Sequence, residues 1–540
     1  MDRPEVPVPS LEAIRGRPLR PFEVFTSTLR SDEVVSIANR TIEEGWSWST
    51  YDPVPLAPPI PWEESAEVNR SWSFHIHSWD QLVPVLTAYD ATREQSFLAA
   101  ALRTAKDWTS NYNTFDVRSA FAWYDMAVGL RAQRLAYLFD AYVRTDTGEE
   151  EVLSLWRSLQ NHVEMLARPE EFKSKSNHGL YQAAGLTAVI HRLPEIDPDG
   201  DLEGRAREMV DAMIDQQFGS DGTHLEHSPD YHRMVLGTII AMREAGLLDS
   251  DRIDDLIEAS DDALAWFVMP NGYLPTIGDS DSRRLGPGTY PLPGAGRQRA
   301  ISAHPWRSAR GRWVASGGSE GSPPRGSVKG FEDGGYLVVR SEETGSYLAM
   351  LAGFHSRAHK HADDLAIVWM ERGQEVLVDG GRFGYLGEGP AQTSPAARAG
   401  FWYGDERRQY VESTHAHSTV EIDGRLHDRV GRAPFGSALT GWGEAGEVGF
   451  GIARVGHNTV EHSRAVATKP GEWLLVVDRL DDPTGDSHRF VANYLLHPDV
   501  GLEVAGDTWI MGLKLADGTR VGVSQLARAA VQLEPVRGSE

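Results

Sequence analysis

The hydrophobic period of this chain changes once, and that change constrains the fold more than any other feature. Between about 78 and 270, apolar residues recur every three or four positions, as in Leu135, Leu138 and Tyr142, which is the spacing of amphipathic helices. Beyond about 330 the period falls to two, with glycine and aspartate between runs of β-formers, as in an all-β sandwich. The sequence therefore predicts an α+β protein of two domains, helical first and antiparallel β second.

Turn-forming residues divide the chain into four segments. Residues 1–75 are rich in proline and tryptophan and are expected to form an irregular, partly helical extension. The helical pattern covers 76–275, and glycine, proline and serine mark 276–330 as a linker before the β domain, 331–540. Candidate strands in that domain are Tyr336–Arg340, Tyr347–Ala352, Leu365–Met370, Glu375–Asp379, Thr419–Ile422, Trp473–Asp478, Phe490–Leu496 and Trp509–Leu513.

Charge and composition narrow the class of partner. The 540 residues include 78 acidic and 53 basic side chains, a formal net charge of −25. This excess argues against nucleic acid or an anionic membrane as partner, although an acidic polysaccharide can bind in a local basic cleft. There is no cysteine, no secretory signal pattern and no apolar run of about 18 residues, so we expect a soluble, cytoplasmic protein. The oligomeric state stays open, a homodimer included.

The segment His355-Ser-Arg-Ala-His-Lys-His-Ala-Asp-Asp364 carries two histidines, His359 and His361, at positions i and i+2. Asp379 follows 18 residues after the second of them, and His417 lies 38 residues beyond Asp379. Nitrogen and oxygen ligands of this kind suit zinc, with water or substrate in the fourth position. One of these two histidines, with Asp379 and His417, is therefore a candidate metal site.

Strand pairing supports this grouping. The runs 365–370 and 375–379 are expected to form a hairpin, which brings His361 and Asp379 to the same open end. If the chain before the hairpin is extended, His359 and His361 share a face, so that one binds metal while the other points into a cleft. The alternative is that these are surface histidines in a turn, the commoner situation for any single histidine.

Two helix starts in the helical domain carry polar side chains. Ser176 is expected to cap a helix that begins with Asn177 and His178. A second helix is expected to begin just before Tyr231, behind a serine cap and a proline in the first helical position. The positive end of a helix stabilises a phenolate and attracts a substrate carboxylate. From spacing alone, two well-capped helices and a buried tyrosine explain the pattern equally.

Two arginines are candidates to bind an acidic sugar. Arg131 can pair with a uronate carboxylate through two parallel hydrogen bonds, although most arginines of this kind form structural ion pairs. Arg357 lies in the same segment as His359. The polar stretch Gly278-Asp-Ser-Asp281 is interpreted as a turn rather than as part of a cleft.

With these residues in view, the chain resembles the heparinase II/III-like polysaccharide lyases from about residue 70 to residue 500. In that family an Asn-His pair opens one toroid helix and a catalytic tyrosine follows further along the toroid. The β-sandwich then supplies a His-x-His-x-Asp segment, an aspartate before glycine and a late histidine. The matching residues here are Asn177, His178, Tyr231, His359, His361, Asp363, Asp379 and His417. The resemblance implies an incomplete (α/α) toroid followed by an antiparallel β-sandwich.

The resemblance also implies roles for single residues. It places zinc, with a mainly structural role, on His361, Asp379 and His417, and it turns His359 towards the substrate. Asp363 would orient a metal-bound histidine, and Tyr385 would line the cleft. One position departs from the pattern: where some relatives have a glutamate three residues after the toroid histidine, this chain has Tyr181. That departure leaves the substrate subclass open.

The activity implied is β-elimination on a polysaccharide or oligosaccharide that contains uronic acid. Asn177, with His178, would neutralise the uronate carboxylate. Tyr231 would protonate the leaving oxygen, and would also be the base when both groups lie on one face; His359 would be the base for the opposite epimer. Two other classes stay open, namely a non-catalytic glycan-binding or assembly protein and a glycoside hydrolase. The hydrolase would need paired cleft carboxylates such as Glu226 with Asp230 or Asp125.

Overall fold

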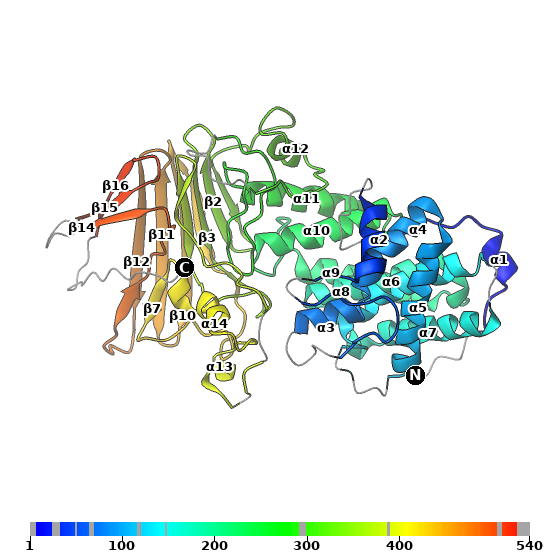
Figure 1. The fold of residues 1–540 in the computed structure, drawn as a ribbon. Helices are drawn as coiled ribbons and strands as arrows, with labels where there is room; N and C mark the ends of the chain where they lie inside the picture. The colour runs from blue at the N-terminus through cyan, green and yellow to red at the C-terminus, as the bar shows by residue number, and fades with distance from the viewer. Residues whose placement is uncertain are drawn as a thin grey trace.

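Helices fill the first half of the molecule and strands the second, so the predicted α+β fold of two domains is confirmed (Figure 1). The helices form an incomplete toroid, and an antiparallel β-sandwich follows it. The computed structural model describes residues 7–23, 33–48, 51–63, 70–115, 119, 121–145, 148–290, 299–385, 389–391, 393–504 and 510–525. Parts of the predicted N-terminal extension and the end of the predicted β domain therefore lie outside the described residues.

In the described part of residues 70–267 the helices follow one another along the chain without intervening strands. Those of the helical half are α1 (Leu11–Arg15), α2 (Val34–Glu44), α3 (Arg70–His77), α4 (Val83–Thr92), α5 (Gln95–Tyr112), α6 (Asp125–Tyr142), α7 (Glu149–Ala167), α8 (Asn177–Arg192), α9 (Asp201–Gln217), α10 (Pro229–Glu244) and α11 (Asp251–Phe267). Three short ones follow, α12 (Ala309–Ala315), α13 (Pro395–Arg398) and α14 (Glu406–Glu412).

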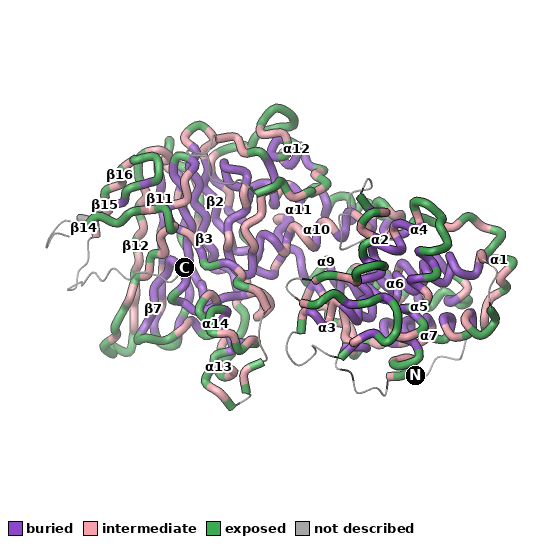
Figure 2. The backbone as a smooth tube through the Cα atoms, viewed as in Figure 1, coloured by how far each residue is buried: buried purple, intermediate pink, exposed green. Residues whose placement is uncertain are grey.

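Helix α6 lies at the centre of the helical half and fixes the position of α8. Every residue from Ala127 to Tyr142 is buried, as the purple core of Figure 2 shows. The two helices meet at Gly129 and Gly185. A Cβ atom on Gly129 would lie 2.1 Å from the carbonyl oxygen of Tyr181, and one on Gly185 would lie 2.3 Å from that of Gly129. Only glycine permits so close an approach, so these positions hold α8 and the residues at its N-terminus in place.

The strands form a five-stranded sheet, a four-stranded sheet and three smaller ones. Sheet order is β1-β2-β3-β5-β6 in the first, β12-β11-β10-β9 in the second, and β14-β15-β16, β13-β7 and β4-β8 in the others. The strands are β1 (Val328–Phe331), β2 (Tyr336–Ser341), β3 (Ser346–Leu351), β4 (Gly353–Phe354), β5 (Ile367–Glu371), β6 (Gln374–Leu377), β7 (Val420–Ile422), β8 (Gly436–Ser437), β9 (Leu439–Ala445), β10 (Val448–His457), β11 (Val460–Lys469), β12 (Trp473–Asp481), β13 (Phe490–Ala492), β14 (Gly501–Val504), β15 (Ile510–Lys514) and β16 (Arg520–Ser524). Each predicted strand matches one of these, with Trp509 outside the described residues.

The five-stranded sheet is buried on both faces because two different cores use its alternate residues. Leu337 and Val339 belong to the core between this sheet and the four-stranded sheet. Tyr336 and Val338, on the other face, belong to a core that also contains Phe267 and its neighbours in α10 and α11. Successive residues of a strand point to opposite faces, so one strand serves both cores. The helical half and the sandwich are therefore joined by a shared hydrophobic core.

Strands β10 and β11 were not predicted, and their inward-facing residues explain why. A Cβ atom on Gly451 would lie 2.4 Å from Leu337, and one on Gly449 would lie 2.6 Å from Val339. Glycine is needed under these large side chains, and it removes the apolar alternation from the sequence. In β11 the inward positions include Arg464, whose guanidinium donates to Asp478 at 2.7 Å and to backbone carbonyls. Small and charged residues thus take core positions that the period-two rule expects to be apolar.

The segment predicted as a linker, 276–330, is not a simple connection. Ile277 and Leu285 lie in the shared core, and Asp279 and Ser280 are buried at 2% and 1% exposure. Helix α12 and the start of β1 also fall in this segment. Its first part therefore belongs to the joint between the two halves.

One arginine completes that joint. Arg340 of β2 is 3% exposed and donates to the carbonyl oxygens of Ala265 and Trp266, at 3.1 and 3.3 Å, in the last turn of α11. These carbonyls sit at the negative end of a helix, where a guanidinium is a favourable partner. Glu342 accepts from Arg340 Nε at 2.7 Å and offsets its charge. The sheet thus binds α11 through hydrogen bonds as well as through apolar packing.

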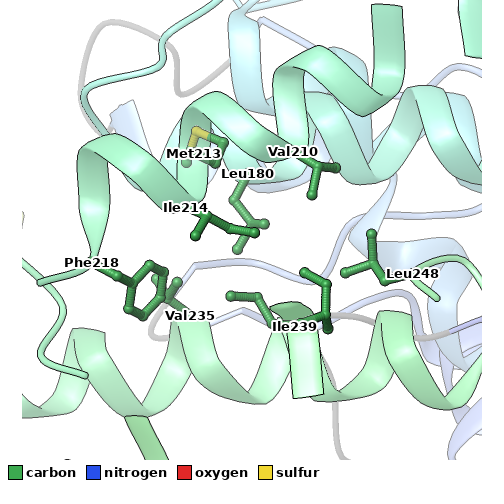
Figure 3. Close-up of a pocket in the computed structure, with 9 residues that line it drawn as sticks. Leu180, Val210, Met213, Ile214, Phe218, Val235, Ile239 and Leu248 are labelled. Carbon is green, nitrogen blue, oxygen red and sulfur yellow. The ribbon is translucent and has the colours of Figure 1, made fainter. Parts of the chain in front are cut away.

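A small pocket between α8, α9 and α10 is lined only by apolar side chains, among them Leu180, Met213 and Ile239 (Figure 3). A lining without hydrogen-bonding groups offers nothing to a charged sugar, so this pocket is a packing defect of the core. None of the helices in the described part of the chain is long and apolar enough to cross a bilayer.

We predict that Arg340→Leu lowers the free energy of unfolding by about 2–4 kcal/mol, because two buried carbonyl oxygens lose a charged donor and Glu342 loses the cation that offsets its charge. Thermal melting followed by circular dichroism measures the change. Arg454→Leu is the control, since Arg454 is exposed and its 3.5 Å pair with Glu461 contributes little. Equal melting temperatures for Arg340→Leu and the wild type would contradict the role given to Arg340.

A second prediction concerns acid stability. Burial lowers the pKa of His232 to about 4, while its Nε2–H donates to the Ser260 carbonyl at 2.8 Å. In the unfolded chain His232 takes up a proton near pH 6.5, whereas in the folded chain it does so only near pH 4. The free energy of unfolding therefore falls as the pH drops from about 6.5 to 4. At about 1.4 kcal/mol per pKa unit the loss is roughly 3 kcal/mol. His232→Gln should show a smaller drop in Tm between pH 7 and pH 5, whereas the surface variant His497→Gln should behave like the wild type.

Candidate active site

The N-termini of α8 and α10 and a loop of the sandwich meet around one polar cluster. Tyr231 lies in the first turn of α10, where its backbone N–H donates to the capping hydroxyl of Ser228 at 3.2 Å. Asn177 and His178 open α8, as predicted, although the Ser176 side chain makes no capping hydrogen bond. The sandwich contributes His359 from the loop before β5. The two predicted helix starts and the predicted histidine segment therefore meet in one place.

His227 connects the two halves at this point. Its Nδ1–H donates to the carbonyl oxygen of Ala358 at 3.1 Å, and its Nε2 accepts from the backbone N–H of His355 at 2.9 Å. The residue is 1% exposed and has a positive φ of 61°. Both ring nitrogens are thus bonded to the backbone on either side of Arg357. This clamp holds the loop that carries His359 against the start of α10.

Tyr231 and His359 lie face to face. Their ring centroids are 3.6 Å apart with an interplanar angle of 25°, and the Tyr231 hydroxyl is 2.6 Å from the hydroxyl of Tyr385. The structure thus brings one phenol and one imidazole together across the two halves. Burial raises the pKa of Tyr231 well above its usual value, so its hydroxyl stays protonated at neutral pH.

Asp279 is the centre of the cluster, and the interpretation of its segment as a turn was wrong. One carboxylate oxygen accepts from His359 Nδ1 at 2.8 Å and from the Tyr385 hydroxyl at 2.9 Å. The other accepts from His361 Nε2 at 2.9 Å and pairs with Arg408 at 2.5 Å. Burial opposes the charge of this carboxyl, but Arg408 and the two histidines hold its pKa well below the usual range.

Asp279 also fixes the proton on His359. A carboxylate only accepts hydrogen bonds, so His359 carries its proton on Nδ1 and leaves a lone pair on Nε2. His359 adopts a positive φ of 54°, so the expectation of an extended chain was wrong at this residue. The positive φ turns His359 and His361 towards the two oxygens of one carboxylate instead of placing them on one face of a strand.

Arg408 and Arg382 belong to the cluster, although no sequence pattern pointed to them. The guanidinium of Arg408 lies 5.1 Å from the ring centre of Tyr385, and that of Arg382 lies 5.2 Å from the same ring. Arg382 pairs with Asp281, while Arg408 also donates to Glu412 at 2.6 Å. Arg382 lies three residues after Asp379, where no pattern marks it, and Arg408 follows the hairpin by many residues, so that only the fold brings it back. Tyr385, predicted to line the cleft, is thus enclosed by cations.

The start of α8 is held by two carboxylates. His178 Nδ1 is 3.0 Å from Asp125, which orients its ring, and its side chain is 32% exposed. The backbone N–H of Asn177 donates to Glu226 Oε1 at 2.9 Å. Tyr181, at the position where some relatives carry a glutamate, is 1% exposed and hydrogen-bonded to Thr238 at 3.2 Å. It is therefore a core residue here.

His361, Asp379 and His417 form the predicted ligand group. Each offers one ligand atom, and these atoms lie within 4.8 Å of one another in buried surroundings. His361 Nδ1 and His417 Nε2 are buried without a hydrogen-bond partner in the described part of the chain, as expected of nitrogens that keep a lone pair for a cation. The residues present therefore fit a metal ion. Asp363 does not orient a histidine as expected, because it pairs with Lys360 instead.

A second group, Asp364, His427 and His457, resembles a metal site in composition only. Asp364 already pairs with Lys360 and Arg432, two cations that would repel a metal. Both nitrogens of His427 are engaged, one accepting from the Asp364 N–H at 3.1 Å and one facing the Val420 carbonyl at 2.8 Å. This group is a buried structural network.

Two arginines were predicted to bind substrate, and the prediction for Arg131 is wrong. This residue is fully buried, hydrogen-bonds His162 at 2.8 Å and the carbonyls of His77 and Ala122, and stacks on Trp108 at 3.9 Å. It belongs to the core of the toroid. Arg357 is half-buried, lies over the ring of Trp402 at 5.3 Å and donates to the Gly400 carbonyl. It stays a prediction as a substrate contact.

Comparison with known proteins agrees with this arrangement. Residues 34–285 match the model described as "Heparinase II/III N-terminus", and residues 323–536 match "Heparinase II/III-like, C-terminal". A heparin-sulfate lyase of Bacteroides thetaiotaomicron is 21% identical over 314 residues, which cover 54% of this chain and 44% of that protein. The chain thus spans less than half the length of this curated relative.

Two solved structures share the fold. The crystal structure of heparinase III superposes with a TM-score of 0.68 at 15% identity, covering 95% of this chain and 85% of that one. The heparan sulfate lyase of Pedobacter heparinus gives 0.64 at 15% identity, covering 96% and 80%. Both family models match in order, and together they include the helix starts, the Asp279 segment and the histidine loop. The chain belongs to the heparinase II/III-like family.

Proposed function

We propose that this protein is a polysaccharide lyase that cleaves a chain containing uronic acid by β-elimination. The observation that carries the proposal is the contact between Tyr231 and His359 at the joint of the two halves. An acid and a base that face one sugar ring are what elimination requires. The family membership and the names of the relatives, heparin-sulfate lyase and heparan sulfate lyase, support an acidic polysaccharide as the substrate class.

The first step is neutralisation of the uronate carboxylate, because the C5 proton is weakly acidic while that carboxylate is charged. Asn177 and His178 stand at the N-terminus of α8, where backbone dipoles also favour an anion. The Asp125 carboxylate accepts from His178 Nδ1, so His178 donates to the uronate through its outward Nε2 in the doubly protonated form of the ring. Donors at this position stabilise the enolate-like state more than the ground state.

The second step is proton transfer at C5 and O4 of the uronate ring. The lone pair on His359 Nε2, kept free by Asp279, removes the C5 proton when that proton lies opposite the leaving group. The C4–C5 double bond forms, the C4–O4 bond breaks, and the protonated Tyr231 hydroxyl donates to O4. For the epimer whose two groups lie on one face, Tyr231 would have to start as the phenolate to take both roles, and burial of its hydroxyl opposes that form. The product has a double bond conjugated with its carboxylate.

The metal in this proposal is zinc, held by His361, Asp379 and His417. Two nitrogens and one oxygen match the preference of Zn²⁺. When bound, the ion adds positive charge and rigidity to this wall of the site. Asp279 accepts from both His361 and His359, so the ligand group and the base share one carboxylate.

A glycoside hydrolase is the second candidate, but its carboxylates are engaged elsewhere. Asp230 accepts from Arg233 and Arg283 at 2.8 Å, and Asp125 is bonded to His178. Hydrolysis would give new reducing ends without ultraviolet absorbance, whereas elimination creates the absorbing conjugated double bond. A non-catalytic glycan binder would show saturable binding with neither product.

We predict that the wild type increases ultraviolet absorbance with at least one member of a panel of uronic-acid polysaccharides headed by heparan sulfate. Tyr231→Phe and His359→Ala should fold and lose turnover by about 10²- to 10⁴-fold, the contribution of a placed acid or base. Tyr494→Phe, on the outer surface of the sandwich, is the control and should keep full activity. Full activity of both site variants on the same substrate would refute the assigned roles.

We further predict that the purified protein contains close to one zinc per chain by elemental analysis. Chelation should lower Tm, because the buried imidazoles and the Asp379 carboxylate lose their shared partner. His417→Ala should reduce the zinc content, whereas His457→Gln, in the second histidine group, should leave it unchanged. Protein without bound zinc, or equal loss in both variants, would remove the zinc assignment.

A further inference from the structure

Glu226 lies between the residues that the proposed function assigns to the substrate carboxylate and to the C5 proton. Its Oε1 accepts the backbone N–H of Asn177 at 2.9 Å. Its Oε2 is 3.9 Å from His359 Nε2 and 3.9 Å from His224 Nε2. The sequence presented this residue only as one member of a hydrolase pair, and the mechanism above does not use it.

The Oε2 atom of Glu226 is buried and makes no hydrogen bond with any residue that the structure describes. The whole residue is 2% exposed. A buried polar atom without a partner destabilises the fold, so it is retained where another role needs it. An unpartnered carboxyl oxygen beside the base and the carboxylate-binding helix start is therefore positioned for a ligand.

The two carboxyls that flank His359 lie in opposite surroundings. Asp279, at Nδ1, is bonded to Arg408 and two histidines, which support its charge. Among the described residues no lysine or arginine pairs with Glu226, and the partners within 4 Å are His224 and His359. Burial raises the pKa of Glu226 above its usual value, and the Asp279 charge adds to that effect. These opposite environments keep the Asp279 carboxyl charged and the Glu226 carboxyl neutral.

We propose, on the basis of the proposed lyase function, that Glu226 is a further catalytic residue that donates a hydrogen bond from its neutral carboxyl group to the carboxylate of the bound uronate. Its O–H is the third donor to that carboxylate, with Asn177 and His178. The substrate carboxylate supplies the partner that Oε2 lacks in the free protein.

The elimination needs no reagent besides the substrate and the side chains named here. His359 Nε2 takes the C5 proton, the electron pair becomes the C4–C5 double bond, and O4 leaves with the proton of Tyr231. Negative charge grows on the uronate carboxylate as the C5–H bond breaks, and the Glu226 hydrogen bond strengthens with it. The proton stays on Glu226 throughout. A donor that gains strength as charge develops lowers the barrier of the chemical step rather than substrate binding.

The kinetic test uses the uronide polysaccharide that the wild type cleaves fastest and the carboxyl methyl ester of the same polymer. The ester has no charge to neutralise. Glu226→Ala should lower kcat by about 10²- to 10³-fold on the free acid and by roughly tenfold or less on the ester. Glu226→Gln keeps an acceptor for Asn177 and places an N–H donor at Oε2, so it should retain most of the activity on both.

A spectroscopic test uses the full-length protein without substrate and does not depend on activity. The infrared difference between wild type and Glu226→Gln at neutral pH should contain the carbonyl band of a protonated carboxylic acid. Glu371, a second buried acid with a raised pKa in β5, cancels in this difference. Glu371→Ala is also the kinetic control: it can lower stability, but it should leave the ratio of acid to ester activity unchanged.

The outcomes separate this inference from the proposed function. A wild type that forms no unsaturated product from any uronide refutes the lyase function itself. An active wild type whose Glu226→Ala variant loses acid and ester activity equally, or whose Glu226→Gln variant is as inactive as Glu226→Ala, overturns the role of Glu226 alone. Absence of the protonated carboxyl band overturns it as well, whether or not the ester is a substrate.

Discussion

The site depends on the clamp that His227 makes between the helical half and the sandwich. A single buried imidazole bonds two backbone groups of the histidine loop, and the same short segment leads into the α10 cap and Tyr231. Without this contact, the face-to-face packing of Tyr231 and His359 would rest on side chains alone. Thr276 and Ser280 strengthen the joint through hydrogen bonds to the Asp379 carbonyl and to Ser228. Backbone contacts across two domains thus position side chains for chemistry.

A second constraint is electrostatic. The chain carries a large negative charge, yet within the cluster the immediate surroundings of each carboxyl group determine whether that group is charged. Asp279 is kept ionised by Arg408 and the histidines, whereas Glu226 has no cationic side chain of that strength beside it. Low-dielectric surroundings amplify both effects, because an unbalanced charge is expensive there and a matched one is stable. Acid and base roles therefore follow from packing as much as from residue type.

The sequence predicted the parts of this protein that follow local rules. The order of domains and the helix starts at Asn177 and just before Tyr231 follow from periodicity and capping, and spacing together with the family resemblance groups His361, Asp379 and His417. Asp279 was missed because a polar turn beside glycine looks the same whether it is exposed or buried at a domain joint. Arg408 was missed because nothing local links it to a histidine that precedes it by many residues. Arg131 was misassigned because sequence does not report that a charged side chain lies inside an aromatic core.

The shared core has a consequence for how such proteins can be altered. Phe267 packs against Phe331 and Tyr336 with ring centroids 5.2 and 5.0 Å apart, so the surface between the halves is as specific as an ordinary protein interior. A chimera that joined this toroid to a relative's sandwich would inherit mismatched side chains there and would lose the register of the histidine loop. The two halves therefore have to change together. Substitutions that alter substrate preference are more readily accommodated in surface loops than an exchange of one whole domain.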